Sequence, residues 1–245
     1  MSKNENDQAM PLATHLLELR TRILRSLGVT LVIFLALFSF ANELYTFIAQ
    51  PLLAELPEGT SMISTEVTGP FLAPFKMALV ISAFLAMPYI LFEIWGFVAP
   101  GLFKSEKKLV APLLVSSVIL FYTGVAFAYY AIFPLMFHFF SMATPEGVTY
   151  APDISSFFSI VSAMFFAFGV IFEIPIATLI LIRTGMTTVE SLSEKRPYII
   201  VGCFTIGMFL TPPDVISQTL MAVPMWMLFE IGIFIGRFIQ PKSSD

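Results

Sequence analysis

Long apolar runs separated by shorter polar segments set the pattern of this chain. Most of the runs approach or exceed about twenty residues, the length at which an α-helix crosses the hydrocarbon core of a bilayer. The ten-residue alternation that is typical of an outer-membrane barrel is missing. The pattern predicts an all-α polytopic membrane protein, one integral membrane domain over residues 1–245 with six transmembrane helices near 24–42, 70–98, 109–137, 156–182, 198–210 and 215–238.

The N-terminal segment, residues 1–22, is expected to lie on the cytoplasmic side before the first span. Residues Met1 to Ala13 are polar and lack apolar periodicity, which predicts a short flexible lead. From Thr14, the stretch THLLELRTRIL puts three apolar side chains on one helical face and Glu18 with Arg22 on another. An amphipathic helix at the membrane interface should therefore lead into the first span.

Two of the runs depart from the length of a simple span. The run at 70–98 is longer than a bilayer core requires, so we expect it to tilt, to project or to kink near Pro88. The run at 198–210 is short enough to be a buried or re-entrant helix as well as a crossing. The segments 43–69 and 138–155 contain acidic residues and no Lys or Arg, and are expected to be connections.

The distribution of basic residues favours six crossings. If every run crosses, 12 of the 13 Lys and Arg residues fall on one side, and only Lys76 falls toward the other. Because cytoplasmic loops carry an excess of Lys and Arg, both termini are expected to be cytoplasmic. The expected location is the cytoplasmic (inner) membrane.

Composition supports this assignment and narrows the chemistry. The chain is 57% hydrophobic and 12% charged, which is too little polar surface to cover a water-soluble globule. A single cysteine, Cys203, excludes an internal disulfide and is expected to be a packing residue. His15 and His138 have no nearby cysteine, so no metal site is expected. We also expect no cofactor, no nucleic-acid partner and no enzymatic activity.

Two acidic residues, Glu18 and Glu106, fall on the expected cytoplasmic side among basic residues. Glu18 precedes Arg22 by four residues, a spacing that also suits a simple surface ion pair. Glu106 precedes the third run, where an acid at a helix start is favourable without any further role. The alternative is that both carboxylates bind a cationic ligand, and arginine suits this best because its planar fork donates two parallel hydrogen bonds.

Glu173 lies inside an apolar run, and a role in function is the default for a carboxylate there. A structural hydrogen bond within the bundle is the alternative. Glu93 and Glu230 are nearer the expected cytoplasmic ends of their runs, where side chains that reach toward the headgroups would account for them.

Polar or soft side chains cluster around the Pro-Pro turn that precedes the last run. Asp214 opens that run and is placed to cap a helix. Met208, Thr211 and Gln218 lie beside the turn and could contact another protein's helix across the membrane, although packing within the subunit fits equally well.

Several long motifs, in order and at matching spacing, closely resemble the TatC family, the multispanning subunits of the twin-arginine protein translocase. They are HLLELRTRI, the Pro51-Leu52 loop, WGFVAPGLFKSEKK, FAFGVIFEIP, KRPYIIVG and FLTPPDVISQTL, and the resemblance extends from about Leu12 to Phe238. The resemblance implies a glove-like bundle whose cytoplasmic face binds twin-arginine signal peptides. By resemblance, the binding residues are Glu18, Glu106, Arg20, Phe97 and Pro51, with Pro88 also at an important position.

The resemblance also implies partners. These are TatB-type and TatA-type single-span subunits, with self-association, and transport driven by the proton-motive force. Met208, Thr211 and Gln218 match the family's contact region for partner helices. Glu173 matches its intramembrane polar position, and Asp214 its outer acidic position.

Two other functions compete with this one. A proton-coupled transporter of small solutes would depend on Glu173. An intramembrane protease has no support, because no GxS motif lies inside an apolar run and no paired intramembrane aspartates occur.

Overall fold

The structure, a computed structural model, describes residues 6–57, 59–98, 110–210 and 214–239. Within these ranges the chain is all-α, as expected, apart from one isolated parallel bridge between Ile63 and Asp153. The elements are α1 (Asn6–Leu37), the 3-10 helix η1 (Phe38–Phe40), α2 (Ala41–Ala54), α3 (Gly69–Leu85), α4 (Met87–Val98), α5 (Val110–Phe127), the π-helix η4 (Ala128–Ile132), α6 (Phe133–Met142), α7 (Ile154–Ile171), α8 (Ile174–Arg183), α9 (Val189–Glu194), α10 (Arg196–Leu210) and α11 (Val215–Ile239).

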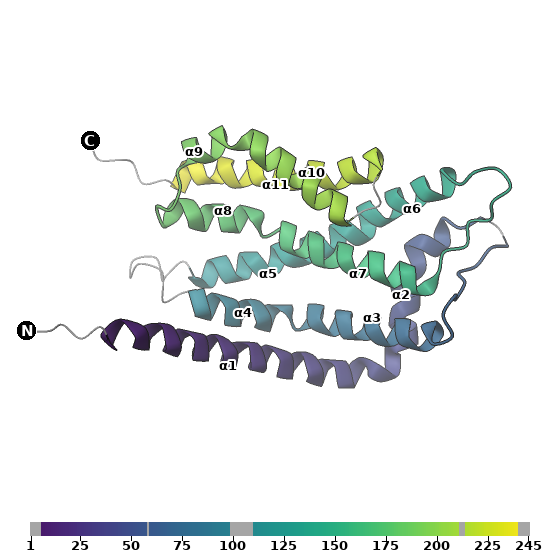
Figure 1. Cartoon of the computed structure of the whole chain (residues 1–245), viewed down its shortest axis with the longest axis horizontal. Helices are drawn as coiled ribbons and strands as arrows, with labels where there is room; N and C mark the ends of the chain where they lie inside the picture. Colours follow the sequence, from purple (N-terminus) through teal and green to yellow (C-terminus); the bar gives the residue numbers. More distant parts are fainter. Residues whose placement is uncertain (1–5, 58, 99–109, 211–213, 240–245) are drawn as a thin grey trace, which may run out of the picture.

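The long helices lie side by side along the molecule (Figure 1). Helix α1 packs against α3 and α4, α5 packs against α4 and α7, and α11 packs against α8 and α10. The start of α1 and the end of α11 lie at the same end of the molecule, at the left in Figure 1, together with the end of α4 and with α9. We call this the basic end, because its described cationic residues are Arg20, Arg22, Arg25, Arg183, Lys195, Arg196 and Arg237.

Four described segments are long and apolar enough to cross a membrane: Thr14–Ala54, Ala111–Met142, Ile154–Arg183 and Val215–Phe238. Helices α3 and α4 also qualify if taken as one span, and they are bent by 51° at their junction. Pro88 is the second residue of α4, so the bend lies where a proline was expected to kink this run. Helix α10 is apolar but shorter than the four segments.

Many large apolar side chains point outward, which suits a surface covered by lipid. On α1, for example, Leu27, Val32 and Leu35 are 59%, 67% and 65% exposed. A water-soluble protein rarely exposes so continuous an apolar surface. The fold is that of a membrane protein built from apolar helices.

Two segments differ from the expectations. The lead expected to be flexible is helical from Asn6, as part of one continuous α1. The connection expected at 43–69 begins with helix α2, which buries Tyr45, Ile48, Ala49 and Leu52. This spacing forms one apolar helical face, and burying that face stabilises α2 despite a proline within it.

Two glycines allow α5 and α7 to pack closely. A Cβ at Gly124 would clash with the Phe168 backbone oxygen, and a Cβ at Gly169 would clash with the buried ring of Phe121. Phe121 also lines the pocket that contains Glu173.

Asp153 joins two connections at the end opposite the basic end. Its Oδ1 accepts hydrogen bonds from the Thr65 backbone N–H and hydroxyl, each at 2.9 Å. Its Oδ2 accepts from the N–H groups of Ser155 and Ser156, each at 3.0 Å, which caps α7. These bonds, that of the Thr65 N–H first, lower the pKa of Asp153 to about 2.

Candidate ligand-binding surface at the basic end

The surface is built on an ion pair within α1. Residues four apart lie on one side of a helix, so Arg22 reaches back to Glu18. Arg22 Nη2 and Nε donate to Glu18 Oε1 at 2.7 and 3.1 Å. The Glu18 side chain remains 39% exposed, and its Oε2 is 4.0 Å from His15 Nδ1. The pairing predicted from the spacing is therefore present.

The same arginine reaches a second carboxylate on α4. Arg22 Nη1 donates to Glu93 Oε2 at 2.8 Å, across 71 residues of sequence. Glu93 is 4% exposed, and its Oε1 accepts from the Tyr89 hydroxyl at 2.8 Å. Arg25 Nη1 lies 3.9 Å from the same oxygen. One guanidinium is thus held between two carboxylates from different helices.

A glycine makes room for this guanidinium. A Cβ on Gly96 would collide with Arg22 Nη1 and lie 3.1 Å from its Cζ. Because glycine has no side chain, the guanidinium can lie against the backbone of α4. A glycine at position 96 is therefore needed for Arg22 to lie in this position.

An aromatic stack lies beside the carboxylates. The rings of His15 and Phe97 are stacked with centroids 4.0 Å apart and planes 15° apart. His15 belongs to the same turn of α1 as Glu18, so the structure brings Phe97 and Glu18 together. Arg20 is exposed on α1 at this end. Chemically, the surface offers carboxylate oxygens and a flat aromatic face, both of which bind guanidinium groups.

Pro51, which was expected to bind the same ligand, is not brought to this surface. Pro51 lies inside α2, at the end of the molecule opposite Glu18 and Phe97 (Figure 1). Its expected place in one binding surface with them is not supported, because α1 runs the length of the molecule between the two sites. Glu106 lies outside the described residues.

Glu173 lies at the break between α7 and α8, in the middle of an apolar segment. It lines a pocket of about 460 Å³ between α4, α5, α7 and α8. A hydrogen bond joins it to Ser117, whose hydroxyl also accepts from Trp95 Nε1 at 3.2 Å. Its Oε1 is buried and has no hydrogen-bond partner in the part of the chain that the structure describes.

The remaining described candidates lie at the end of α10 and at the start of α11. Met208 is 49% exposed. Gln218 donates from Nε2 to the Phe204 carbonyl at 2.8 Å, so its amide is used within the subunit. Asp214 Oδ1 accepts from the Ser217 N–H at 2.7 Å, which confirms the predicted helix cap. Thr211 lies outside the described residues.

Two acids have partners that the sequence did not predict. Extension of the side chain toward the headgroups does not fully account for Glu93 and Glu230, because each accepts hydrogen bonds from an arginine of another helix. The contacts are long-range, which is why the pattern along the chain did not reveal them. The available signal was the excess of arginines on α1, where Arg22 and Arg25 share one face three residues apart and only Glu18 lies within one helical turn of Arg22.

The helices and this surface together define the class of protein. The chain is a multispanning all-α membrane protein in which Arg22 is held between two carboxylates at the basic end. Residues 14–224 match the family described as Sec-independent protein translocase protein (TatC). The chain belongs to the TatC family of protein translocases.

Similar proteins support this assignment over the whole length. The chain is 56% identical over 248 residues to the Sec-independent protein translocase protein TatC of Azotobacter chroococcum mcd 1, covering 100% of this chain and 97% of that protein. It is 54% identical to the protein of that name from Haemophilus influenzae, covering 98% and 93%. A crystal structure of the twin arginine translocase receptor TatC superposes with a TM-score of 0.81 at 35% identity, covering 92% of this chain and 99% of that chain.

Proposed function

We propose that this chain is the signal-peptide receptor and core subunit of a twin-arginine translocase, which exports folded proteins using the proton-motive force. The observation that carries the proposal is the position of Arg22, whose guanidinium lies between the carboxylates of Glu18 and Glu93. The surface therefore already accommodates the chemical group that a twin-arginine signal peptide presents in duplicate.

A ligand arginine has two ways to bind here. It can approach Glu18 Oε2, which accepts no bond from Arg22, or it can replace Arg22 on Oε1 while Arg22 stays on Glu93. Phe97 provides a face on which the second guanidinium can stack. Glu106, in the neighbouring segment of sequence, completes the proposed site.

Binding of a labelled peptide to the purified protein tests this proposal. A peptide with two arginines should bind more tightly than one with two lysines, because lysine cannot form the two-bond fork. Glu18→Gln should weaken binding of the arginine peptide roughly 10-fold or more, as expected for losing a charged hydrogen bond. The control is Glu43→Gln, an exposed acid at the start of α2 at the opposite end. Equal binding by both variants would refute the site.

We further propose six crossings with both termini in the cytoplasm. The start of α1 and the end of α11 lie at one end of the molecule, where the basic residues gather (Figure 1). Cysteine labelling with a membrane-impermeant reagent tests this in a Cys203→Ala background, since Cys203 is the one native cysteine. Val148→Cys should label in intact cells. Glu194→Cys should label only after permeabilisation; the reverse pattern would overturn the orientation.

The proposed contact region for TatA-type and TatB-type subunits is the short α10 and the start of α11, with Met208, Thr211, Gln218 and Asp214. The outward-facing side chains of α10 support it, among them Met208 at 49% and Phe209 at 80% exposure. A cysteine at Met208 should crosslink to a single-span partner, whereas one at Leu35, which is 65% exposed on α1, should not. Equal crosslinking at both positions would indicate nonspecific contact.

A further inference from the structure

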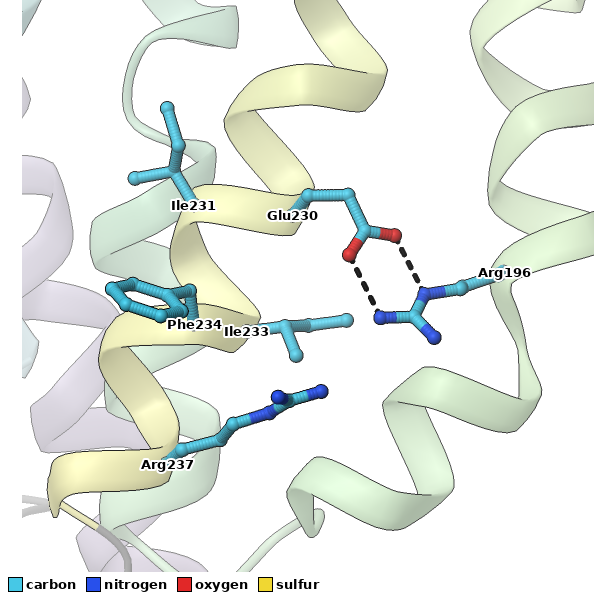
Figure 2. Close-up of a pocket in the computed structure, with 6 residues that line it drawn as sticks. All are labelled: Arg196, Glu230, Ile231, Ile233, Phe234 and Arg237. Carbon is cyan, nitrogen blue, oxygen red and sulfur yellow. Dashed lines mark hydrogen bonds and ion pairs between the residues drawn. The ribbon is translucent and has the colours of Figure 1, made fainter.

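A charged pocket lies where α10 begins and α11 ends (Figure 2). Its volume is about 420 Å³, and its lining combines two arginines, one acid and three apolar side chains: Arg196, Glu230, Ile231, Ile233, Phe234 and Arg237. None of these residues belongs to the surface formed by α1 and α4. The pocket is therefore a second polar feature of the basic end.

One arginine is fixed by the acid. Arg196 Nε donates to Glu230 Oε1 at 2.6 Å, and its Nη2 donates to Oε2 at 2.8 Å, as Figure 2 shows. Two parallel bonds set the plane of the guanidinium, and they do not involve Nη1. The pair thus leaves part of a preoriented donor group facing the pocket.

No acid among the described residues pairs with the second arginine. Arg237 is exposed, and it forms no hydrogen bond or ion pair with any described residue. The pocket therefore holds two guanidinium groups and one carboxylate, a surplus of one positive charge. The ion pair between Arg196 and Glu230 is complete without Arg237. The positive charge of Arg237 is therefore the one that an anionic ligand would neutralise.

The position of the pocket indicates the kind of anion. The apolar segment Val215–Phe238 ends here, so the arginines lie at the depth of the lipid headgroups in the proposed orientation. Beside them, Ile231 and Phe234 face outward with 45% and 59% exposure. A ligand that suits both the arginines and these apolar side chains has a phosphate next to acyl chains. Arginine binds phosphate oxygens with the same two-bond geometry that it uses for carboxylates.

We propose that this pocket binds the phosphate of an anionic phospholipid headgroup. Arg237 and Arg196 contact the phosphate, Glu230 positions Arg196, and Phe234 and Ile231 contact the glycerol and the first part of the acyl chains. The site is specific for one bound lipid rather than for the bilayer surface in general, because a fixed guanidinium and a free one converge on it.

Native mass spectrometry of the purified full chain tests this proposal. The protein is titrated with phosphatidylglycerol, with phosphatidylcholine of the same acyl chains, and separately with inorganic phosphate. Phosphatidylglycerol should bind roughly fivefold more tightly than phosphatidylcholine, as expected for one basic residue near an anionic headgroup. Arg237→Gln should abolish that preference. The variant should fold normally, because the side chain has no partner to lose among the described residues.

The matched control is Arg20→Gln, an exposed arginine of the same end that lies on α1 outside the pocket. It should keep the full preference. The proposal is overturned if Arg237→Gln keeps the preference, if Arg20→Gln loses it to the same extent, or if inorganic phosphate displaces the lipid at equal concentration. The last result would identify a site for free phosphate instead of a lipid.

Discussion

Gly96→Ala tests whether the guanidinium of Arg22 is held between two helices. The added Cβ would occupy the place of Arg22 Nη1, and an arginine tip can move aside more easily than the backbone of α4. Arg22 should therefore leave Glu93 and stay with Glu18. Glu93, 4% exposed, would keep the Tyr89 hydroxyl and the more distant Arg25.

The expected change in the free energy of unfolding follows from two opposing contributions. Losing a hydrogen bond between charged groups costs about 1.5–3 kcal/mol. Alanine is favoured over glycine inside a helix by about 1 kcal/mol. Gly96→Ala should therefore destabilise the protein by about 0.5–2 kcal/mol, although an alanine in a helix would otherwise be stabilising.

Gly28→Ala is the control, because a Cβ there has no atom within 4 Å. It should be neutral or stabilise by up to about 1 kcal/mol. Reversible unfolding in mixed micelles titrated with SDS measures both variants under the same conditions. If Gly96→Ala is as stable as Gly28→Ala, the guanidinium does not depend on the space above Gly96 and the reasoning fails.

Three further predictions concern other parts of the fold. Asp153→Asn should reduce the loss of stability on acidification. The pKa of Asp153 in the folded protein, about 2, is below its ordinary value of 3.8, so its contribution to the free energy of unfolding is complete above about pH 4 and disappears as the pH falls through 2. Unfolding curves that match the wild type over this range would contradict the prediction. Gly169→Ala should cost about 1–3 kcal/mol through the clash with Phe121, whereas Gly202→Ala, with open space at its Cβ, should not; equal unfolding midpoints would refute the packing argument. Glu173→Gln should leave the free energy of unfolding unchanged or raise it, because no described cation pairs with this carboxylate, and a clear loss of stability would show a missing partner.

The features that the sequence predicted are those encoded locally. Apolar runs predicted helices, Pro88 predicted the bend between α3 and α4, and the spacing of Glu18 and Arg22 predicted their ion pair. The cap at Asp214 is local as well. In each case the interacting groups are separated by only a few residues, so helical periodicity is enough to place them.

The features that the sequence could not predict depend on how distant helices pack. Glu93 belongs to the surface because α4 packs against α1, and Glu93 is 71 residues from its partner Arg22 in the sequence. Pro51 lies far from the surface also because of how the helices are arranged: α1 runs to the opposite end of the molecule before α2 begins (Figure 1). The bond between Asp153 and Thr65 joins segments 88 residues apart.

The arrangement at the basic end also suggests how selectivity could arise. Arg22 already occupies Oε1 of Glu18, so a ligand that replaces it on this oxygen must donate two hydrogen bonds equally well. A peptide that is merely basic provides charge without that geometry and should compete poorly. The internal arginine would thus raise the threshold for binding in favour of paired arginines.

Site-specific photocrosslinking of a labelled twin-arginine peptide tests the central claim most directly. Probes replace Leu16 on α1 and Leu53 on α2, two exposed positions at opposite ends of the molecule, so that neither probe removes a binding residue. The peptide should crosslink at position 16, and replacing its two arginines by lysines should abolish the product. Crosslinking mainly at position 53, or a product at position 16 that is indifferent to the arginines, would contradict the proposed surface.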